Sequence, residues 1–421
     1  MSAPPARPHA GSGRPWARGL TRTVVLLAIA SLLTDVSSEI ILPLLPLFVI
    51  GLGGTLFVVG VIDSVADSTA TFVKLFGGHV SDRLGRRKPF VAAGYGVSTA
   101  TKAGLPFAMS WLHVFGLRIG DRVGKGVRDP PRDALIAEST RPETLGKAFG
   151  FHRGMDTTGA ILGPAIVIAV LPWLYAQGTP VQALRVLFLL AVVPAFAALL
   201  VVLVVREARA PPKPGLRIRI SLRALPVRLR LFVGVAGLYS LANFTLSIPI
   251  VVVYYQALNA EFSEVTAVVL ATLNYLLFNV VYALLAVRAG SLSDRIGRKP
   301  VILTGYAAFV AGSLGFALFS SPFLVFLSFL AYGVSYGFVE GTQRALVADL
   351  APKELKATSM GTYHAAVGLG KLPASILAGA LATLVAPWAA FLTSAAIASM
   401  AAAFFVGTFA DTKSAVPTHP R

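Results

Sequence analysis

The chain has 421 residues, of which 55% are apolar and only 13% are charged. A soluble domain carries about 25% charged residues, so this composition excludes an ordinary soluble protein and indicates a surface that faces lipid. The formal net charge is +18, but the basic residues cluster in short segments between long apolar runs, which is typical of membrane topology and not of a nucleic-acid footprint.

The N-terminal segment, residues 1–21, is rich in Pro, Gly and Arg and has no apolar core. We expect a disordered cytoplasmic tail and not a signal peptide, because the first apolar run, from Val24, is longer than a signal sequence needs. The chain contains no cysteine, which excludes disulfides, thiolate metal sites and thiol catalysis.

Twelve apolar segments follow. A helix needs about 20 apolar residues to cross the hydrocarbon layer, and each segment approaches or exceeds that length. The sequence therefore predicts an all-α membrane protein with twelve transmembrane helices. The predicted spans are 22–50, 55–78, 89–110, 112–137, 146–174, 183–205, 229–257, 264–288, 299–319, 323–348, 357–385 and 388–410.

Charge placement predicts the orientation. The connections on the side of the N-terminus are basic, whereas the opposite loops carry few charges, and Lys and Arg mark the cytoplasmic side. Both termini are therefore expected in the cytoplasm, in the inner (plasma) membrane. Residues 206–228 form the longest polar stretch and are interpreted as a cytoplasmic linker; contact with anionic lipid is the alternative. The predicted units are a bundle at 22–205, a bundle at 229–410 and a tail at 411–421.

An internal repeat relates the two bundles. Gly-His-Val-Ser-Asp-Arg-Leu-Gly-Arg-Arg, which begins at Gly78, matches Gly-Ser-Leu-Ser-Asp-Arg-Ile-Gly-Arg, which begins at Gly290. The segments that end at Glu138 and Asp349 also resemble each other. Matches that occur in the same order indicate a duplicated unit of six spans.

The repeated loop resembles the signature loop of the major facilitator superfamily, and Arg122-Val-Gly-Lys-Gly126 resembles another element of that superfamily. Gly159, Gly163 and Pro164 resemble an element of its bacterial drug–proton antiporters. The resemblance implies two pseudo-symmetric six-helix bundles and transport by alternating access. Gly159, Gly163 and Pro164 are also expected to allow close helix packing, which is the simpler explanation.

The two loop motifs are interpreted as a cytoplasmic latch. Their arginines could bind acidic residues at nearby helix ends when the protein faces outward and release them when it faces inward. A tight turn with ordinary cytoplasmic positive charge is the simpler alternative. The expected latch residues are Gly78, Asp82, Arg83, Gly85, Arg86, Glu138, Asp294, Arg295, Arg298 and Asp349.

Ionisable residues inside spans are costly and mark functional sites. A carboxylate that gains and loses an arginine partner can release and bind a proton. We expect Asp35 or Glu39 to carry the proton with Arg122 as partner, and Asp156 with His152 as a second relay; structural ion pairs are the alternative. The proton-coupling candidates are Asp35, Glu39, Asp63, Asp67, Arg122, His152 and Asp156.

A polar and aromatic set of residues is expected to bind substrate, since tyrosine rings with hydroxyl tips suit an amphipathic organic ligand. The same residues could instead only bridge helices. The candidates are Arg118, Lys125, Tyr239, Asn243, Asn274, Tyr275, Tyr332, Tyr336, Glu340 and Gln343.

The favoured function is proton-coupled export of small amphipathic organic molecules by a monomer, without enzymatic activity, metal, cofactor or nucleic acid. One alternative is transport of an organic anion or a metal-chelating metabolite, because Arg118, Arg122, Lys125 and Arg153 could bind carboxylate or phosphate. A membrane enzyme or a receptor that does not transport is an alternative of another class.

Overall fold

The computed structural model describes residues 20–206, 225–352 and 355–409. The predicted N-terminal and C-terminal tails and most of the basic linker lie outside these residues, and the predictions for them stay predictions. The described residues fold into helices joined by short connections, and no strand occurs among them.

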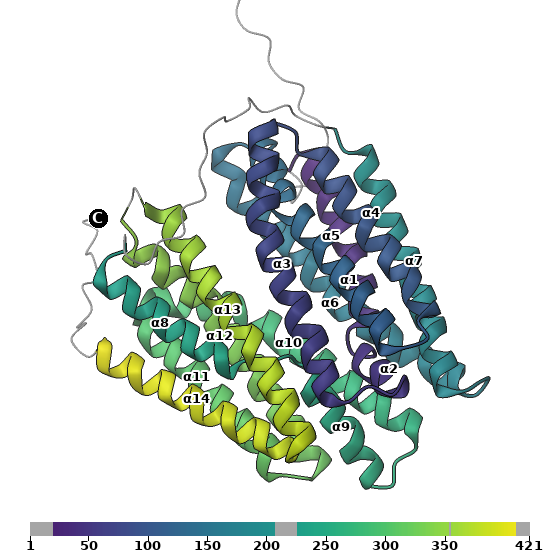
Figure 1. Cartoon of the computed structure of the whole chain (residues 1–421). Coiled ribbons are helices and arrows are strands. Elements are labelled where there is room, and N and C mark those ends of the chain that lie inside the picture. The colour runs from purple at the N-terminus through teal and green to yellow at the C-terminus, as the bar shows by residue number, and fades with distance from the viewer. Residues whose placement is uncertain (1–19, 207–224, 353–354, 410–421) are drawn as a thin grey trace, which may run out of the picture.

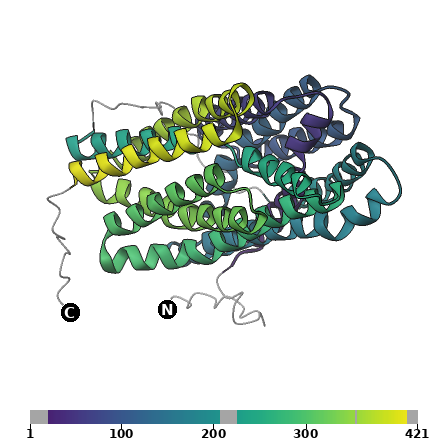
Figure 2. The ribbon, with the colours of Figure 1, turned by 90° about the horizontal axis from the view of Figure 1, so that it is seen from below.

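The helices fall into two groups, which we call the first half (α1–α7) and the second half (α8–α14). Figure 1 shows the first half in purple to blue and the second half in teal to yellow, and Figure 2 shows the same two groups from below. The first half comprises α1 (Arg22–Ile41), α2 (Leu45–Gly51), α3 (Leu56–Leu84), α4 (Lys88–Gly104), η2 (Leu105–Phe107), α5 (Trp111–Glu138), η3 (Pro142–Thr144), α6 (Leu145–Tyr175) and α7 (Pro180–Val204). The second half comprises α8 (Val227–Ala242), α9 (Ser247–Asn259), α10 (Glu264–Ile296), α11 (Arg298–Leu318), α12 (Pro322–Leu350), α13 (Lys356–Leu384) and α14 (Pro387–Thr408).

Ten helical segments of the described chain are long and apolar enough to cross a membrane. The other two long helices are α4, which has 17 residues, and α5, which carries a dense stripe of charges. Together they form the twelve membrane helices that the sequence predicts, and the all-α fold class is confirmed.

Two of the predicted continuous spans are interrupted. The first span breaks at 42–44 around Pro43, and the seventh breaks at 243–246, shortly before Pro249. Proline has no N–H for the helical hydrogen bond. The breaks occur at corresponding places in the two halves, so they belong to the repeat.

The two halves pack with the same pattern. In the first half, α1 contacts α6 and α7, and α5 contacts α3 and α4. In the second half, α8 contacts α13 and α14, and α12 contacts α10 and α11. Exchanging the halves also exchanges the two main contacts between them, α3 with α13 and α10 with α6. The packing therefore has the pseudo-twofold symmetry that the sequence repeat predicts.

Helix N-caps are a common feature of one end of the molecule. We call the end with the connections at 52–55, 105–110, 176–179 and 260–263 the hairpin end. Four helices start there at a hydroxyl that accepts a hydrogen bond from the backbone N–H three residues later. These hydroxyls belong to Thr55, Ser110, Thr179 and Ser263. We call the opposite end, with the connections at 85–87, 139–144 and 297, the linker end.

The halves are sealed together toward the hairpin end. One buried apolar cluster joins Leu44 and Phe48 of the first half to Val251 and Val268 of the second. Figure 1 shows α2 and α9, which contact each other, together at the lower end. A second buried cluster, which includes Val24, Tyr95 and Ile136, lies nearer the linker end. All of its members among the described residues belong to the first half. Apolar packing between the halves is therefore concentrated toward the hairpin end.

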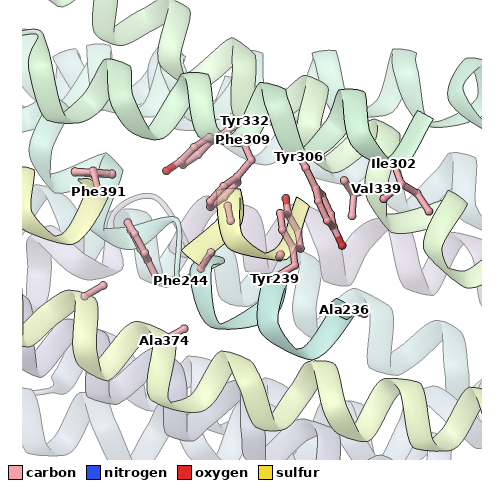
Figure 3. Close-up of a cluster of buried hydrophobic side chains, with 14 of the residues drawn as sticks. Ala236, Tyr239, Phe244, Ile302, Tyr306, Phe309, Tyr332, Val339, Ala374 and Phe391 are labelled. Carbon is pink, nitrogen blue, oxygen red and sulfur yellow. The ribbon is translucent and has the colours of Figure 1, made fainter. Parts of the chain in front are cut away.

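Stacked aromatic rings form the core of the second half. Tyr239 stacks on Tyr306 with ring centres 4.0 Å apart, and Phe309 stacks on Tyr332 at 4.9 Å. Figure 3 shows these four rings side by side between α8, α11 and α12. Their hydroxyls also have partners, because Tyr239 bonds to Ser335 and Tyr332 to Ser313. Buried tyrosine hydroxyls need such partners. The core therefore combines apolar ring packing with hydrogen bonds for these hydroxyls.

Candidate functional site

Two adjoining cavities lie where the halves meet, with volumes of about 280 Å³ and 140 Å³. They share Asn243, Tyr336 and Lys371. The larger cavity is lined entirely from the second half: Ala236, Tyr239, Ser240, Asn243, Tyr336, Val339, Glu340, Gln343, Arg344, Tyr363, His364, Val367 and Lys371. The smaller cavity is lined from both halves: Leu42, Asp63, Ser64, Asp67, Arg118, Arg122, Asn243, Phe244, Thr245, Leu246, Ser247, Tyr275, Tyr336, Lys371 and Ser375.

A ladder of ion pairs joins α3 to α5. Arg118 lies 3.7 Å from Asp63, Arg122 lies 3.1 Å from Asp67, and Lys74 lies 2.9 Å from Asp129. Positions 63, 67 and 74 share one face of α3, since helical residues four and seven apart lie close together. The partners on α5 follow the same spacing because the two helices run side by side in the same direction. The first two pairs line the smaller cavity.

Asp63 also joins the first half to the second. Its carboxylate accepts hydrogen bonds from the hydroxyls of Thr245, at 2.7 Å, and Ser247, at 2.5 Å. These two residues lie at the break between α8 and α9. Non-helical backbone is tolerated inside a membrane where it is buried in protein or lines a cavity. The break therefore brings polar groups of the second half to a buried carboxylate of the first.

The two carboxylates of α1 lie beside the glycines of α6. A Cβ added to Gly159 would come within 2.8 Å of the Asp35 Cβ, and one added to Gly163 within 2.6 Å of the Glu39 Cβ. Glu39 accepts a hydrogen bond from Tyr275 of α10 at 2.7 Å, which is a second polar link between the halves. Asp35 has no ion pair within 4 Å among the described residues.

A chain of hydrogen bonds runs from the first half to the residues of the second half that line the larger cavity. Arg153 of α6 donates to the Tyr282 hydroxyl at 2.9 Å, and Tyr282 in turn donates to Glu340. Glu340 is also bound by Arg344 at 2.7 Å. Tyr336 donates to Asn243 at 2.6 Å, beside the break between α8 and α9. These bonds hold four polar residues that line the larger cavity, Glu340, Arg344, Tyr336 and Asn243.

Most of the predicted substrate residues line the cavities, and three do not. The seven that line them are Arg118, Tyr239, Asn243, Tyr275, Tyr336, Glu340 and Gln343. Tyr332 is buried in the aromatic core, bonded to Ser313. Asn274 faces a separate pocket with Gln256 and Phe326. Lys125 lines neither cavity. The substrate-binding role of all ten residues stays a prediction.

The predicted proton-coupling residues divide into separate pairs. Arg122 binds Asp67 and makes no ion pair with Asp35 or Glu39, so the expected pairing of Arg122 with the α1 carboxylates is absent from this structure. His152 Nδ1 lies 3.6 Å from Asp156, as the second relay requires, and Arg153 lies 3.9 Å from the same carboxylate. The coupling roles of all seven residues stay predictions.

Two matching clusters at the linker end contain four of the predicted latch residues, Glu138, Asp294, Arg298 and Asp349. Arg298 donates to Asp349 at 3.0 Å and also binds Asp294. Glu138 is bound by Arg87, at 3.1 Å, and not by Arg83 or Arg86, which are exposed. Arg295 is exposed as well. Gly85 ends α3 with a φ of 63°, a left-handed conformation that glycine adopts readily. Gly78 lies within α3, and the side chain of Asp82 lies outside the described part of the chain.

Arg87 is the residue that the sequence analysis missed in this region. It donates to Ser81 at 3.0 Å, as Arg298 donates to Ser293 at 2.6 Å. Aligning the repeats on their Arg-Lys-Pro triplets, which begin at Arg87 and Arg298, would have found it. Each cluster lies within one half. Opening and closing of these bonds between states therefore stays a prediction.

Three cavity residues were also missed or given no role. Thr245 and Ser247 contact Asp63 across 182 and 184 positions of the chain, and only a polar sequence before Pro249 signals the break. Lys371, which lines both cavities, was given no role. Its signal is a lysine in the middle of an apolar segment, which is costly unless it faces a polar cavity.

The fold and the cavity define a multi-pass membrane transport protein, and the comparisons give its family. The model described as Major Facilitator Superfamily matches residues 27–236 and 232–420. An uncharacterized MFS-type transporter of Methanocaldococcus jannaschii is 36% identical over 368 residues, which cover 86% of this chain and 89% of that protein. The chain belongs to the major facilitator superfamily.

More distant similarities agree with this assignment. Multidrug resistance protein MdtH of Aeromonas hydrophila is 30% identical over 138 residues, 32% of this chain and 34% of that protein. The nucleoside transporter NupG has the same fold, with a TM-score of 0.76, 16% identity, and coverage of 92% of this chain and 99% of that one. A bacterial homolog of the human lysosomal transporter Spinster has a TM-score of 0.75, 13% identity, and coverage of 94% and 97%.

Proposed function

We propose that this protein is a secondary active transporter that exports small amphipathic organic molecules in exchange for protons. The observation that carries the proposal is a pair of adjoining cavities. The smaller is lined by both halves and contains ion pairs, and the larger is lined by the second half and contains tyrosines. Ligand pockets of about 300–1,000 Å³ suit small organic molecules. The partial similarity to multidrug resistance protein MdtH supports export of this class of molecule.

The substrate would lie mainly against the second half. Tyr239, Tyr336 and Tyr363 give the larger cavity aromatic surface, and Asn243 and Gln343 add polar groups. Tyrosine offers an apolar ring face and a polar tip, which fits molecules that have both kinds of surface. The cavity therefore favours an amphipathic ligand over an inorganic ion or a strongly hydrated sugar.

Proton coupling would use the carboxylates that link the halves. Asp63 binds Thr245 and Ser247, and Glu39 binds Tyr275, so these two groups join the first half to the second. A carboxylate that becomes protonated loses its charge-assisted hydrogen bonds. Proton binding at Asp63 or Glu39 would therefore weaken a contact between the halves, and Asp35, close to Glu39 on α1, belongs to the same group.

Alternating access would proceed by rocking of the two halves. Apolar packing between them is concentrated toward the hairpin end, around Phe48 and Val251. The basic connections at the linker end favour the cytoplasm for that end, by the positive-inside rule. In this orientation the structure represents a form closed toward the outside. We propose that the protein works as a monomer with both termini in the cytoplasm of the cell, in the plasma membrane.

The test is dye transport in inverted membrane vesicles with an imposed pH gradient. Accumulation of ethidium and of carboxyfluorescein, one cationic and one anionic amphipathic dye, would be measured by fluorescence. We expect Asp63→Asn, Glu39→Gln and Asp35→Asn to lower gradient-driven accumulation at least about tenfold, because each change removes a protonatable group.

The control is Glu143→Gln, which removes a carboxylate from an exposed connection at the linker end. It should accumulate dye as the unmodified protein does. Gradient-driven accumulation at full rate in all three carboxylate variants would refute the coupling proposal. Accumulation that ignores the pH gradient in the unmodified protein would refute proton exchange altogether.

A further inference from the structure

The charges that line the two cavities do not balance. The formally charged lining residues are Asp63, Asp67, Glu340, Arg118, Arg122, Arg344 and Lys371. Each carboxylate has an arginine of its own: Asp63 has Arg118, Asp67 has Arg122 and Glu340 has Arg344, at 3.7, 3.1 and 2.7 Å. Arg118 also lies 3.7 Å from Asp121, which lines neither cavity. Among the charged lining residues, Lys371 is the one for which the described residues provide no ion pair within 4 Å.

Lys371 lies at the junction of the cavities and lines both. It is partly buried on α13, and within the described residues no carboxylate lies within 4 Å of its ammonium group. Asp67 and Glu340 are the carboxylates that act on it electrostatically, and both are already bound by arginines. Tyr336, which donates its hydroxyl proton to Asn243, acts on the ammonium group as well. No carboxylate of the described residues is paired with Lys371 alone, so the ammonium group can bind an anionic ligand.

We infer that Lys371 binds the negative group of the substrate, a small organic anion with one carboxylate or phosphate on an aromatic or apolar body. This inference rests on the proposed function and names its substrate class. A partly buried ammonium group that shares its nearby carboxylates with arginines is stabilised further by an anion that binds it directly. The body of the ligand lies in the larger cavity against Tyr239, Tyr336 and Tyr363.

Other sites for an anion are less suitable. Arg118 and Arg122, which the sequence offered for carboxylate or phosphate, already pair with Asp63 and Asp67. Arg153 is bonded to Tyr282, and Lys125 lines neither cavity. A cationic ligand would add to the unbalanced positive charge at Lys371. The cavities, with about 280 Å³ and 140 Å³, are also small for a phospholipid with two long acyl chains.

The test compares ligands that share one shape and differ in charge. The purified full chain in a maltoside detergent would be titrated with 3-phenylpropionate, 3-phenylpropionamide and 3-phenylpropylamine, with binding followed by thermal shift. Phenyl phosphate and dihexanoyl phosphatidic acid separate a free anion from a lipid headgroup. The unmodified protein should bind 3-phenylpropionate or phenyl phosphate at least about tenfold more tightly than the amide and the amine.

Variants assign the effect to Lys371. Lys371→Gln should weaken anion binding at least about tenfold, and Lys371→Arg should retain most of it because the charge is kept. The matched control is Arg288→Gln, which removes an exposed positive charge of α10 outside the cavities. It should bind the anions as the unmodified protein does.

Several outcomes would overturn the inference. These are equal binding of amide and anion by the unmodified protein, no binding of any anion, an unchanged affinity in Lys371→Gln, or binding of the lipid alone. If Lys371→Gln fails to fold, the preference of the unmodified protein for the anion over the amide still decides. The proposed export function is judged separately, by dye accumulation under a pH gradient, and can stand if Lys371 proves irrelevant.

Discussion

At the scale of single residues, the glycines of α6 determine how closely α1 approaches. A Cβ on Gly163 would lie 2.6 Å from the Glu39 Cβ and 2.8 Å from its backbone carbon. Gly154 lies on the same helix, and a Cβ there would have no atom within 4 Å. Small residues allow close helix approach in membranes. A change to alanine at Gly163 therefore tests close packing, whereas the same change at Gly154 tests only the general preference of helices for alanine.

We predict that Gly163→Ala destabilises the protein by about 1–3 kcal/mol, the usual cost of overpacking a well-packed site. Because the clash includes backbone atoms of α1, no side-chain rotation removes it. The measurement is the thermal midpoint of the purified protein in detergent. Gly154→Ala is the control and should leave the midpoint unchanged or raise it slightly. Equal midpoints for the two variants would contradict the packing argument.

At the scale of helices, the ladder between α3 and α5 contains pairs of different strength. Asp129 lies within 4 Å of three cations, Lys74, Arg132 and Arg128, and its side chain is only 12% exposed. Asp133, one turn further along α5, is 50% exposed and binds Arg132. A buried carboxylate among several cations is costly to remove because it leaves them facing one another.

We predict that Asp129→Asn lowers stability by about 2–4 kcal/mol, whereas Asp133→Asn costs about 0–1 kcal/mol, as exposed ion pairs do. Both variants remove one charge from the same stretch of α5, so each serves as the control of the other. Thermal unfolding in detergent at two salt concentrations would measure both. A smaller loss for Asp129→Asn than for Asp133→Asn would show that the ladder does not hold α3 to α5.

The same scale shows what the sequence could predict. The sequence located all twelve spans, ten of them long and apolar enough to cross a membrane. The face shared by Asp63, Asp67 and Lys74 was visible as helical spacing. Their partners on α5 were not assigned, because spacing within one helix says nothing about the register between two. The break at 243–246 was also missed, since Asn243 and Ser247 lie in a segment that is apolar enough overall to be interpreted as continuous.

At the scale of the whole molecule, the repeat predicted the two-half architecture, but not which contacts join the halves. Asp63 and Thr245, or Glu39 and Tyr275, come from segments far apart in the chain, and the sequence repeat does not pair these residues with each other. Such contacts depend on the rotation of one half against the other. Alternating access would require the same sequence to support more than one arrangement of the halves. The sequence therefore does not specify one set of contacts between the halves, and the cavity residues could be predicted only in part.

Movement of the halves can be tested by cross-linking, and the absence of cysteine from the chain makes the experiment direct. Phe57 of α3 and Thr383 of α13 lie in different halves near the hairpin end, with the Phe57 amide donating to the Thr383 hydroxyl at 2.9 Å. We predict that Phe57→Cys with Thr383→Cys, joined by a short bifunctional thiol reagent, loses at least about tenfold in dye transport. Joining these positions prevents the separation of the halves that alternating access requires.

The matched control joins two positions at the same end within one half. The Gln256 side chain of α9 donates to the Phe319 carbonyl, after α11, at 3.2 Å. Gln256→Cys with Phe319→Cys should cross-link and keep its transport, because α9 and α11 move together if the second half is rigid. Reducing conditions or omission of the reagent should restore the first pair. Full transport by the cross-linked Phe57 and Thr383 pair would mean that the halves do not part at the hairpin end, and rocking would then be excluded for this protein.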